Sequence, residues 1–170
     1  MSKTLWMACG IPGSGKSTWI REHINKTNSI HCSRDEVRFA MLKDNEDYFA
    51  HEDEVWCAWI KQIKDGLENP EVENIYVDAT HLNDKAREKV LKELITYDFD
   101  TKYLVFAVPG DTCLERNEGR TGRAYVPRSV IRRMFFCFEF PKGDNIYFIN
   151  EKGEFIDEPN LCSLGSSLWA

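Results

Sequence analysis

The sequence predicts an α/β fold in which helices cover both faces of a central parallel sheet. Short apolar runs rich in branched and aromatic residues, typical of buried strands, alternate along the 170 residues with segments whose apolar residues recur at helical spacing. The chain contains neither an internal repeat nor a linker between domains. A single domain is therefore expected over residues 1–159, followed by a Ser/Gly/Leu-rich tail over 160–170, for which disorder is one interpretation.

Turn and capping residues set the limits of the expected elements. The long central helix ends at Asn69-Pro70, and Asp111 and Pro127 mark the starts of two later helices. A hairpin is expected around Glu151-Lys152-Gly153. In chain order the strands span residues 3–9, 29–33, 74–78, 102–108 and 145–149, and the helices span 16–25, 34–42, 48–67, 83–97, 111–117 and 127–138.

The composition is that of a globular protein, with 42% hydrophobic and 29% charged residues. No apolar run approaches the length of a membrane span and the N-terminus does not resemble a signal peptide, so a cytoplasmic protein without a membrane partner is expected. The six cysteines form no Cys-x-x-Cys pair, which argues against a zinc finger or a redox pair. The net charge of −6 disfavours non-specific coating of nucleic acid, but not an enzyme with a local basic pocket.

The strongest motif is a glycine-rich loop between the first strand and the first helix. It matches the Walker A pattern at every required position and reads Gly10-Ile11-Pro12-Gly13-Ser14-Gly15-Lys16-Ser17. Glycines let backbone N–H groups point at phosphates, and the following helix adds its positive amino end. Lys16 would serve the β- and γ-phosphates of ATP, and Ser17 would offer a hydroxyl to Mg²⁺. A chance glycine turn is disfavoured by the strand and helix that flank the loop.

A carboxylate and an arginine follow the second strand, at the edge of the sheet that faces the phosphate loop. Asp35 and Arg38 are three residues apart and would share one helix face. Asp35 could accept the proton of an attacking hydroxyl, and Arg38 could hold an anionic part of the acceptor. The alternative is an ordinary helix start, with Ser33 as its cap and the acidic residues favouring the helix dipole.

The third strand ends in Asp78 and continues into polar residues that include Thr80 and His81. Asp78 could orient the water shell of Mg²⁺ or anchor an arginine, and the polar groups could face the acceptor. The alternative is that Asp78 only ends a strand, while Asn83 or Asp84 caps the next helix. A loop histidine such as His81 is expected to be solvated rather than catalytic.

An arginine-rich segment over residues 116–126 predicts a lid. Arg116 and Arg120 could place positive charge over a migrating phosphoryl group, as transfer requires. Gly119 and Gly122 would allow the segment to move and to exclude water. The alternative is a solvated basic turn, which is also the interpretation favoured for Arg132 and Arg133.

In their order and spacing these features resemble the kinase domain of the phage-type 5′-polynucleotide kinases, within the P-loop kinases related to zeta toxins. The resemblance covers roughly residues 3–149. It rests on the loop from Gly10 to Trp19, on Arg34-Asp35 with Arg38, on Asp78-Ala79-Thr80, and on Arg116-Asn117 through Arg120 to Val126-Pro127. His81 departs from the family, which often has Asn at this position. The resemblance implies an adenylate-kinase-like P-loop fold with an arginine lid.

The resemblance also implies a role for each matching residue. ATP and Mg²⁺ would be bound by residues 10–18, which end in Thr18, with Ser17 at the metal. Asp35 would be the general base for the 5′-hydroxyl of a DNA or RNA end, with Lys16 and Arg120 completing the catalytic set. Arg38 would hold the adjacent phosphate, and Asp78 and Thr80 would support the acceptor site. Arg116 and Arg120 would cover the donor phosphates.

Two other functions remain open at this point. A small-molecule kinase of the same fold would act on a sugar, a nucleoside or a nucleotide-sugar, and the acidic net charge favours it modestly. A non-catalytic nucleotide-binding module is disfavoured by Asp35, Arg38 and the lid arginines, because a sensor has no use for an acceptor base. Neither the sequence nor the resemblance indicates an obligate protein partner.

Overall fold

The computed structural model describes residues 2–160 and residue 164, so nearly all of the expected tail lies outside the described residues. Six strands form one sheet in the order β2-β3-β1-β4-β5-β6, in which every neighbouring pair is parallel except β5 and β6. The antiparallel pair is the hairpin expected near the C-terminus. The strands are β1 (Lys3–Cys9), β2 (Ser29–Ser33), β3 (Asn74–Asp78), β4 (Phe99–Phe106), β5 (Ile146–Ile149) and β6 (Phe155–Ile156).

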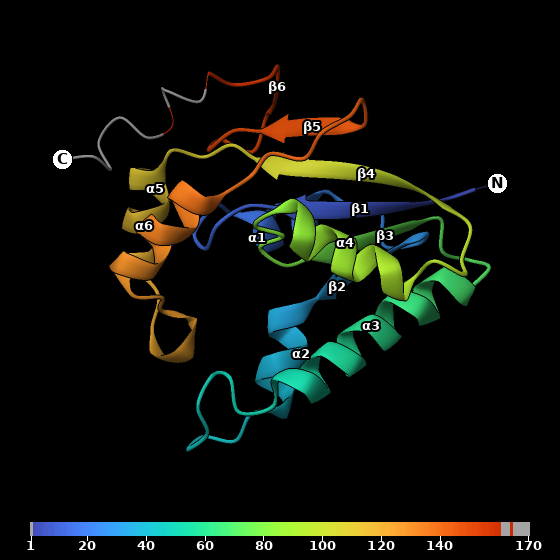
Figure 1. The fold of residues 1–170 in the computed structure, drawn as a ribbon, viewed down its shortest axis with the longest axis horizontal. Coiled ribbons are helices and arrows are strands. Elements are labelled where there is room, and N and C mark those ends of the chain that lie inside the picture. The colour runs from blue at the N-terminus through green and yellow to red at the C-terminus, as the bar shows by residue number, and fades with distance from the viewer. Residues whose placement is uncertain (1, 161–163, 165–170) are drawn as a thin grey trace.

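Helices cover both faces of this sheet, as the sequence predicts, and each face has its own apolar core (Figure 1). Leu5, Met7 and Cys9 of β1 pack toward α3 and α4, whereas the alternate residue Ala8 packs toward α1, α5 and α6. The helices are α1 (Lys16–His23), α2 (Arg34–Met41), α3 (Glu52–Glu68), α4 (Asp84–Glu93), α5 (Gly110–Glu118) and α6 (Arg128–Cys137), with a short 3₁₀ turn η1 (Gly122–Ala124).

Several boundaries differ from the expected ones for local reasons. The long helix begins at Glu52 instead of residue 48, because three consecutive acidic residues stabilise its first turn there. Phe49, expected on its buried stripe, is 66% exposed. β4 begins at Phe99 because it pairs with β1 from Lys3 onward. Asp111 does not cap α5; Pro109 stands at that position and Asp111 lies in the first turn.

Two observations concern the cysteines and the helices of the described part. Its five cysteines, at positions 9, 32, 57, 113 and 137, are free thiols. Among the described residues, no helix combines the length and the apolar character needed to cross a lipid bilayer.

Candidate active site

The phosphate loop connects β1 to α1 at the edge of the sheet where the parallel strands end (Figure 1). Gly13 and Gly15 adopt φ values of 86° and 87°, which side chains rarely tolerate. A Cβ on Gly13 would lie 2.4 Å from the carbonyl oxygen of Cys113 in α5. The loop therefore needs glycine at this position both for its conformation and for its approach to α5.

The side chain of Lys16, the first residue of α1, reaches back across the phosphate loop. Its Nζ donates hydrogen bonds to the carbonyl oxygens of Gly10, at 2.9 Å, and Ile11, at 3.4 Å. Burial lowers the pKa of Lys16, and the negative charges of Asp78 and Asp35 partly offset this effect. The hydroxyl of Ser14 is buried in the same loop without a hydrogen-bond partner among the described residues. An unpaired hydroxyl and an ammonium held only by carbonyls fit a loop that binds phosphate.

Ser17, Asp78 and His31 form a connected polar group beside the loop. The Ser17 hydroxyl donates to Asp78 Oδ2 at 2.5 Å, and His31 Nε2 contacts the same oxygen at 2.8 Å. Burial alone would raise the pKa of Asp78, but the hydrogen bond from His31, the charge of Lys16 and the bond from Ser17 together lower it. An ionised carboxylate next to the Ser17 hydroxyl fits the coordination sphere of Mg²⁺ and its water.

Asp35 and Arg38 share one helix face, as their spacing predicts, and both belong to a larger network. Asp35 Oδ1 accepts hydrogen bonds from the hydroxyl of Tyr48, at 2.7 Å, and from Arg38. Arg38 is buried and also donates to Tyr48, at 2.6 Å, and to Glu52. Burial and the adjacent Asp35 carboxylate raise the pKa of Tyr48, so that its hydroxyl remains a donor.

The capping alternative is also confirmed, for the residue that it names. Ser33 caps α2 by accepting a hydrogen bond from the backbone of Glu36, at 3.3 Å. Asp35 lies in the first turn of α2 and is exposed. One short segment provides both a helix cap and a carboxylate that faces Tyr48 and Arg38.

Arg116 and Arg120 lie on different parts of the expected lid. Arg116, in α5, donates to the carbonyl oxygens of Gly13, at 3.3 Å, and Glu151, at 2.7 Å. Arg120 follows α5, and its charge contributes to lowering the pKa of Lys16. Gly122 adopts a φ of 58°, whereas Gly119 has an ordinary helical conformation that any residue can adopt. Of these two glycines, Gly122 alone therefore has a backbone conformation that favours glycine.

Two contacts that the sequence does not reveal hold the segment over residues 116–126, which the sequence predicts to be a lid, at its base and its tip. Asn117 is fully buried and exchanges hydrogen bonds with the backbone of Val126, at 2.7 and 3.0 Å. At the tip, Arg123 donates to the backbone carbonyl of Lys43 in the α2–α3 loop. The segment thus reaches from α5 to the loop that carries Tyr48.

The segment after β3 supports the phosphate loop from behind. The carbonyl of Thr80 accepts a hydrogen bond from the backbone of Gly10 at 3.0 Å, and His81 Nδ1 donates to the carbonyl of Ala8 at 2.6 Å. The expectation that His81 is solvated is wrong. Its backbone adopts a φ of 43°, and its ring is buried with the centroid 6.0 Å from that of Trp59.

Burial of His81 should make the protein less stable in acid. Burial lowers its pKa from the ordinary 6.5 to about 4, so between these values the unfolded chain binds more protons than the folded one. This stability is present above pH 6.5 and is lost as the pH falls toward 4, by an amount on the order of 3 kcal/mol.

The variant His81→Asn tests this loss, because asparagine tolerates positive φ and does not titrate. Urea unfolding of both proteins at several pH values should show a steeper acid loss for the wild type. Parallel pH profiles for the two proteins would contradict the assignment.

A pocket of about 270 Å³ opens on the outer side of the phosphate loop. Trp19 Nε1 donates to the carbonyl of Gly153 at 3.0 Å, which fixes the β5–β6 hairpin against α1 and closes one wall. The lining combines loop residues with the hairpin: Ser14, Gly15, Thr18, Trp19, Glu22, Phe106, Arg116, Ile149, Asn150, Glu151, Lys152 and Gly153. Its position beside the loop fits the nucleoside part of ATP.

A larger pocket of about 440 Å³ lies between the edge strand β2 and α3. It shares only His31 with the polar group around Asp78, and it contains none of the residues of the phosphate loop. The smaller pocket is therefore the better candidate for the nucleotide.

A Walker A loop at the carboxyl edge of a parallel sheet flanked by helices defines the P-loop NTPase fold, here of the adenylate-kinase-like kind that the sequence predicts. This fold implies a nucleotide with Mg²⁺ at the loop. Residues 5–141 match the model of a family described as AAA domain, and the chain belongs to that family.

Solved structures share this fold at low sequence identity. A chain of the Pnkp1/Rnl/Hen1 RNA repair complex is 24% identical, with a TM-score of 0.68, over 80% of this chain and 44% of that one. A gluconokinase from Sinorhizobium meliloti 1021 is 16% identical, with a TM-score of 0.51, over 96% and 86%. Kti12 from Chaetomium thermophilum, in complex with ADP-AlF3, is 17% identical, with a TM-score of 0.59, over 86% and 88%. The chain spans less than half of the RNA repair chain.

Proposed function

We propose that this protein is an ATP-dependent 5′-hydroxyl polynucleotide kinase, which transfers the γ-phosphoryl group of ATP to the 5′-hydroxyl end of DNA or RNA. The observation that carries the proposal is the position of Asp35. This carboxylate is exposed, it is oriented by Tyr48 and Arg38, and it lies close enough to Lys16 to influence the pKa of that ammonium. A base for an acceptor hydroxyl thus lies near the group that would hold the donor phosphates.

In the proposed reaction Asp35 accepts the proton of the 5′-hydroxyl as its oxygen attacks the γ-phosphorus in line. A new P–O bond forms to the acceptor, the bond between the γ-phosphorus and the bridging oxygen breaks, and ADP leaves. Lys16, Arg116 and Arg120 stabilise the charge on the phosphoryl oxygens. Ser17 and Asp78 would hold Mg²⁺ and its water. The metal ion would supply further positive charge to the same phosphates.

The role proposed for Arg38 requires a change of partners. Its terminal nitrogens contact Asp35, Tyr48 and Glu52. An acceptor phosphate would take the place of the Glu52 carboxylate, and the bond to Asp35 would keep the base in position. Thr80 and Asp78 lie behind this site and support it through the phosphate loop and His31.

The lid proposed over residues 116–126 would close above the donor phosphates. Its tip contacts the acceptor-side loop through Arg123, and its base carries Arg116 against the phosphate loop. Closure would bring Arg120 to the transferred group and exclude water from it.

The fold shared with the RNA repair chain is compatible with a polynucleotide acceptor. A small-molecule kinase is the second candidate. The net charge of −6 and the pairing of Arg38 with two carboxylates favour a neutral acceptor. The fold of the gluconokinase is compatible with this candidate over 96% of the chain.

The decisive measurement is transfer from γ-labelled ATP to a short 5′-hydroxyl oligonucleotide, with a panel of sugars and nucleosides assayed in parallel. The 5′-phosphorylated form of the same oligonucleotide is the matched control, since it lacks the accepting hydroxyl. Labelling of the 5′-hydroxyl form alone is the expected result. Labelling of a sugar or nucleoside in its place would establish the second candidate. Tight ATP binding without transfer to any acceptor would point to a non-catalytic module.

A further inference from the structure

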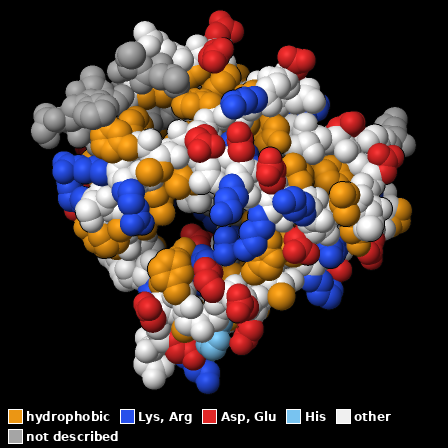
Figure 2. Space-filling view, viewed as in Figure 1, with side chains coloured by type: hydrophobic (Ala, Val, Ile, Leu, Met, Phe, Trp, Pro, Cys, Tyr) orange, Lys and Arg blue, Asp and Glu red, His pale blue; other side chains and the backbone are white. Residues whose placement is uncertain are grey.

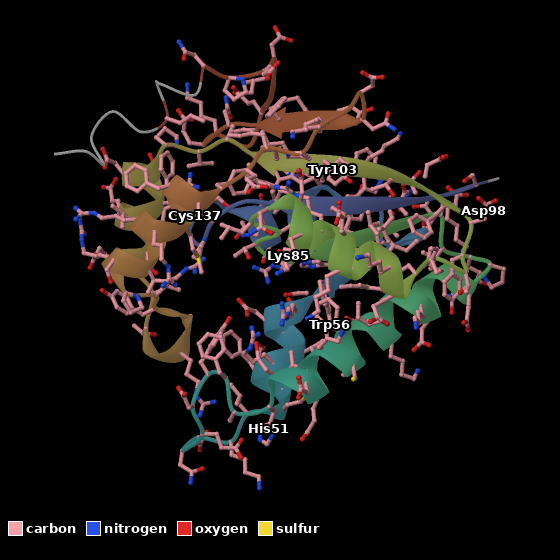
Figure 3. The ribbon with its side chains drawn as sticks, viewed as in Figure 1. His51, Trp56, Lys85, Asp98, Tyr103 and Cys137 are labelled. Atoms are coloured by element: carbon pink, nitrogen blue, oxygen red, sulfur yellow. The ribbon has the colours of Figure 1, made fainter. Side chains whose placement is uncertain are left out.

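Two cationic side chains contact one indole ring, and one of them belongs to Arg34, the residue before Asp35. Arg34 of α2 and Lys89 of α4 both contact Trp56 of α3, and Lys85 lies one turn before Lys89. We call these four residues the basic–aromatic track. Figure 2 shows Lys and Arg side chains gathered along one rim of a hollow, over α4 and the start of α2, and Figure 3 labels Trp56 and Lys85 on this side of the molecule.

Trp56 holds two of these cations in place. The guanidinium carbon of Arg34 lies 5.3 Å from the centroid of the Trp56 ring, and Nζ of Lys89 lies 4.3 Å from it. Contacts of this kind attract a cation to the ring without neutralising its charge. The side chains are thereby ordered while their positive charge remains available to a ligand.

Few carboxylates pair with the positively charged side chains of the track. Within residues 2–160, neither Lys85 nor Lys89 forms a salt bridge. Arg34 makes one long contact of 3.5 Å with Glu52, whose nearer partner is Arg38. In a chain with a net charge of −6, a cationic strip that begins at the residue next to Asp35 distinguishes this surface from ordinary solvated lysines.

We infer that the basic–aromatic track binds the phosphodiester backbone of the acceptor strand, on the 3′ side of the hydroxyl that receives the phosphoryl group. The inference rests on the proposed function and narrows its acceptor to a single strand of several nucleotides. Proteins that bind single strands combine a cationic groove with aromatic side chains, as the track does. The first phosphates beyond the reactive nucleoside would contact Arg34, and later ones would contact Lys89 and Lys85.

The double variant Lys85→Ala/Lys89→Ala tests the inference, because both residues are exposed and neither has an ion pair to lose within residues 2–160. The matched control is Lys26→Ala/Lys142→Ala, which removes the same charge from the residues before β2 and β5, away from the phosphate loop. The affinity for a 5′-hydroxyl oligonucleotide with a fluorophore at its 3′ end is measured by anisotropy at several salt concentrations. KM and kcat are measured with that oligonucleotide and with a nucleoside 3′-monophosphate.

The logarithm of affinity falls with the logarithm of salt concentration by about 0.7 per phosphate contact on a single strand. Loss of two contacts should therefore reduce this slope by about 1.4. KM for the oligonucleotide should rise, while KM for the mononucleotide and both kcat values stay at the wild-type level. The control variant should behave as the wild type in all of these measurements.

Two results would overturn the inference while leaving the proposed function intact. One is a wild-type salt slope in the track variant with normal transfer to the oligonucleotide. The other is an equal rise in KM for the oligonucleotide and the mononucleotide, which would place the lysines at the reactive nucleoside. If the wild type itself transfers nothing to the oligonucleotide, the proposed function fails, and the inference fails with it.

Discussion

Replacing Asp35 with asparagine is expected to slow phosphoryl transfer by about 10²–10⁴-fold while ATP binding stays nearly unchanged. The amide has the same shape and can still accept a hydrogen bond from Tyr48, but it cannot accept the proton of an acceptor hydroxyl. In the proposed binding mode, ATP contacts the phosphate loop and the pocket beside the β5–β6 hairpin, and Asp35 lines neither. Transfer rates at saturating ATP, together with an equilibrium measurement of ATP binding, separate the two effects.

The matched control is Glu36→Gln, which changes the next carboxylate along the same helix. Glu36 is exposed and pairs with Arg21 at 3.3 Å, so its loss should leave the transfer rate unaltered. A variant of Asp35 that transfers as fast as the wild type would remove the proposed base. Equal losses in both variants would indicate a general effect of charge at the start of α2.

Replacing Lys16 with methionine is expected to lower transfer on the order of 10²–10³-fold without unfolding the protein. The variant loses the charge that would neutralise the donor phosphates. Burial lowers the pKa of Lys16, which means that the folded protein disfavours this charge, and methionine removes it. The lost hydrogen bonds to Gly10 and Ile11 act in the opposite direction, so the free energy of unfolding should stay within about 1 kcal/mol of the wild type.

Urea unfolding and the transfer assay measure these two outcomes independently. Lys26→Met, at an exposed position before β2, is the control for the substitution itself. A large loss of stability in the Lys16 variant would show that the lysine mainly tethers the loop carbonyls. Full transfer activity would show that the loop does not bind the donor phosphates in the proposed way.

The elements of this fold could be predicted because their signals are local. Each strand from β1 to β5 is a short apolar run, and the phosphate loop is a contiguous motif. The order of the strands in the sheet is different, because it depends on which runs pair across long distances. β1 lies between β3 and β4 although β2 follows it in the chain, and no local pattern specifies this order.

The positions of the two carboxylates could be predicted because Asp78 ends a strand and Asp35 starts the helix that follows one, whereas their roles in the site stay predictions. The side chains that contact these residues could not be predicted from the sequence. Tyr48 and Glu52 belong to the α2–α3 loop and the first turn of α3, and they meet Arg38 only because that loop folds back on α2. His81 was misjudged because its burial depends on a positive φ and on the ring of Trp59, neither of which the sequence reveals.

In the proposed function, the two apolar cores of the sheet lie beneath different parts of the site, one under the donor side and the other under the acceptor side. The helices that carry the nucleotide side, α1 and α5, pack on one face. On the other face packs α3, which supplies Glu52 and Trp56 to the acceptor side. That core also contains Cys9, the residue before the phosphate loop, and Trp59, whose ring packs on His81. A substitution that repacks the core beneath α3 should therefore change the support of the phosphate loop together with the proposed acceptor side.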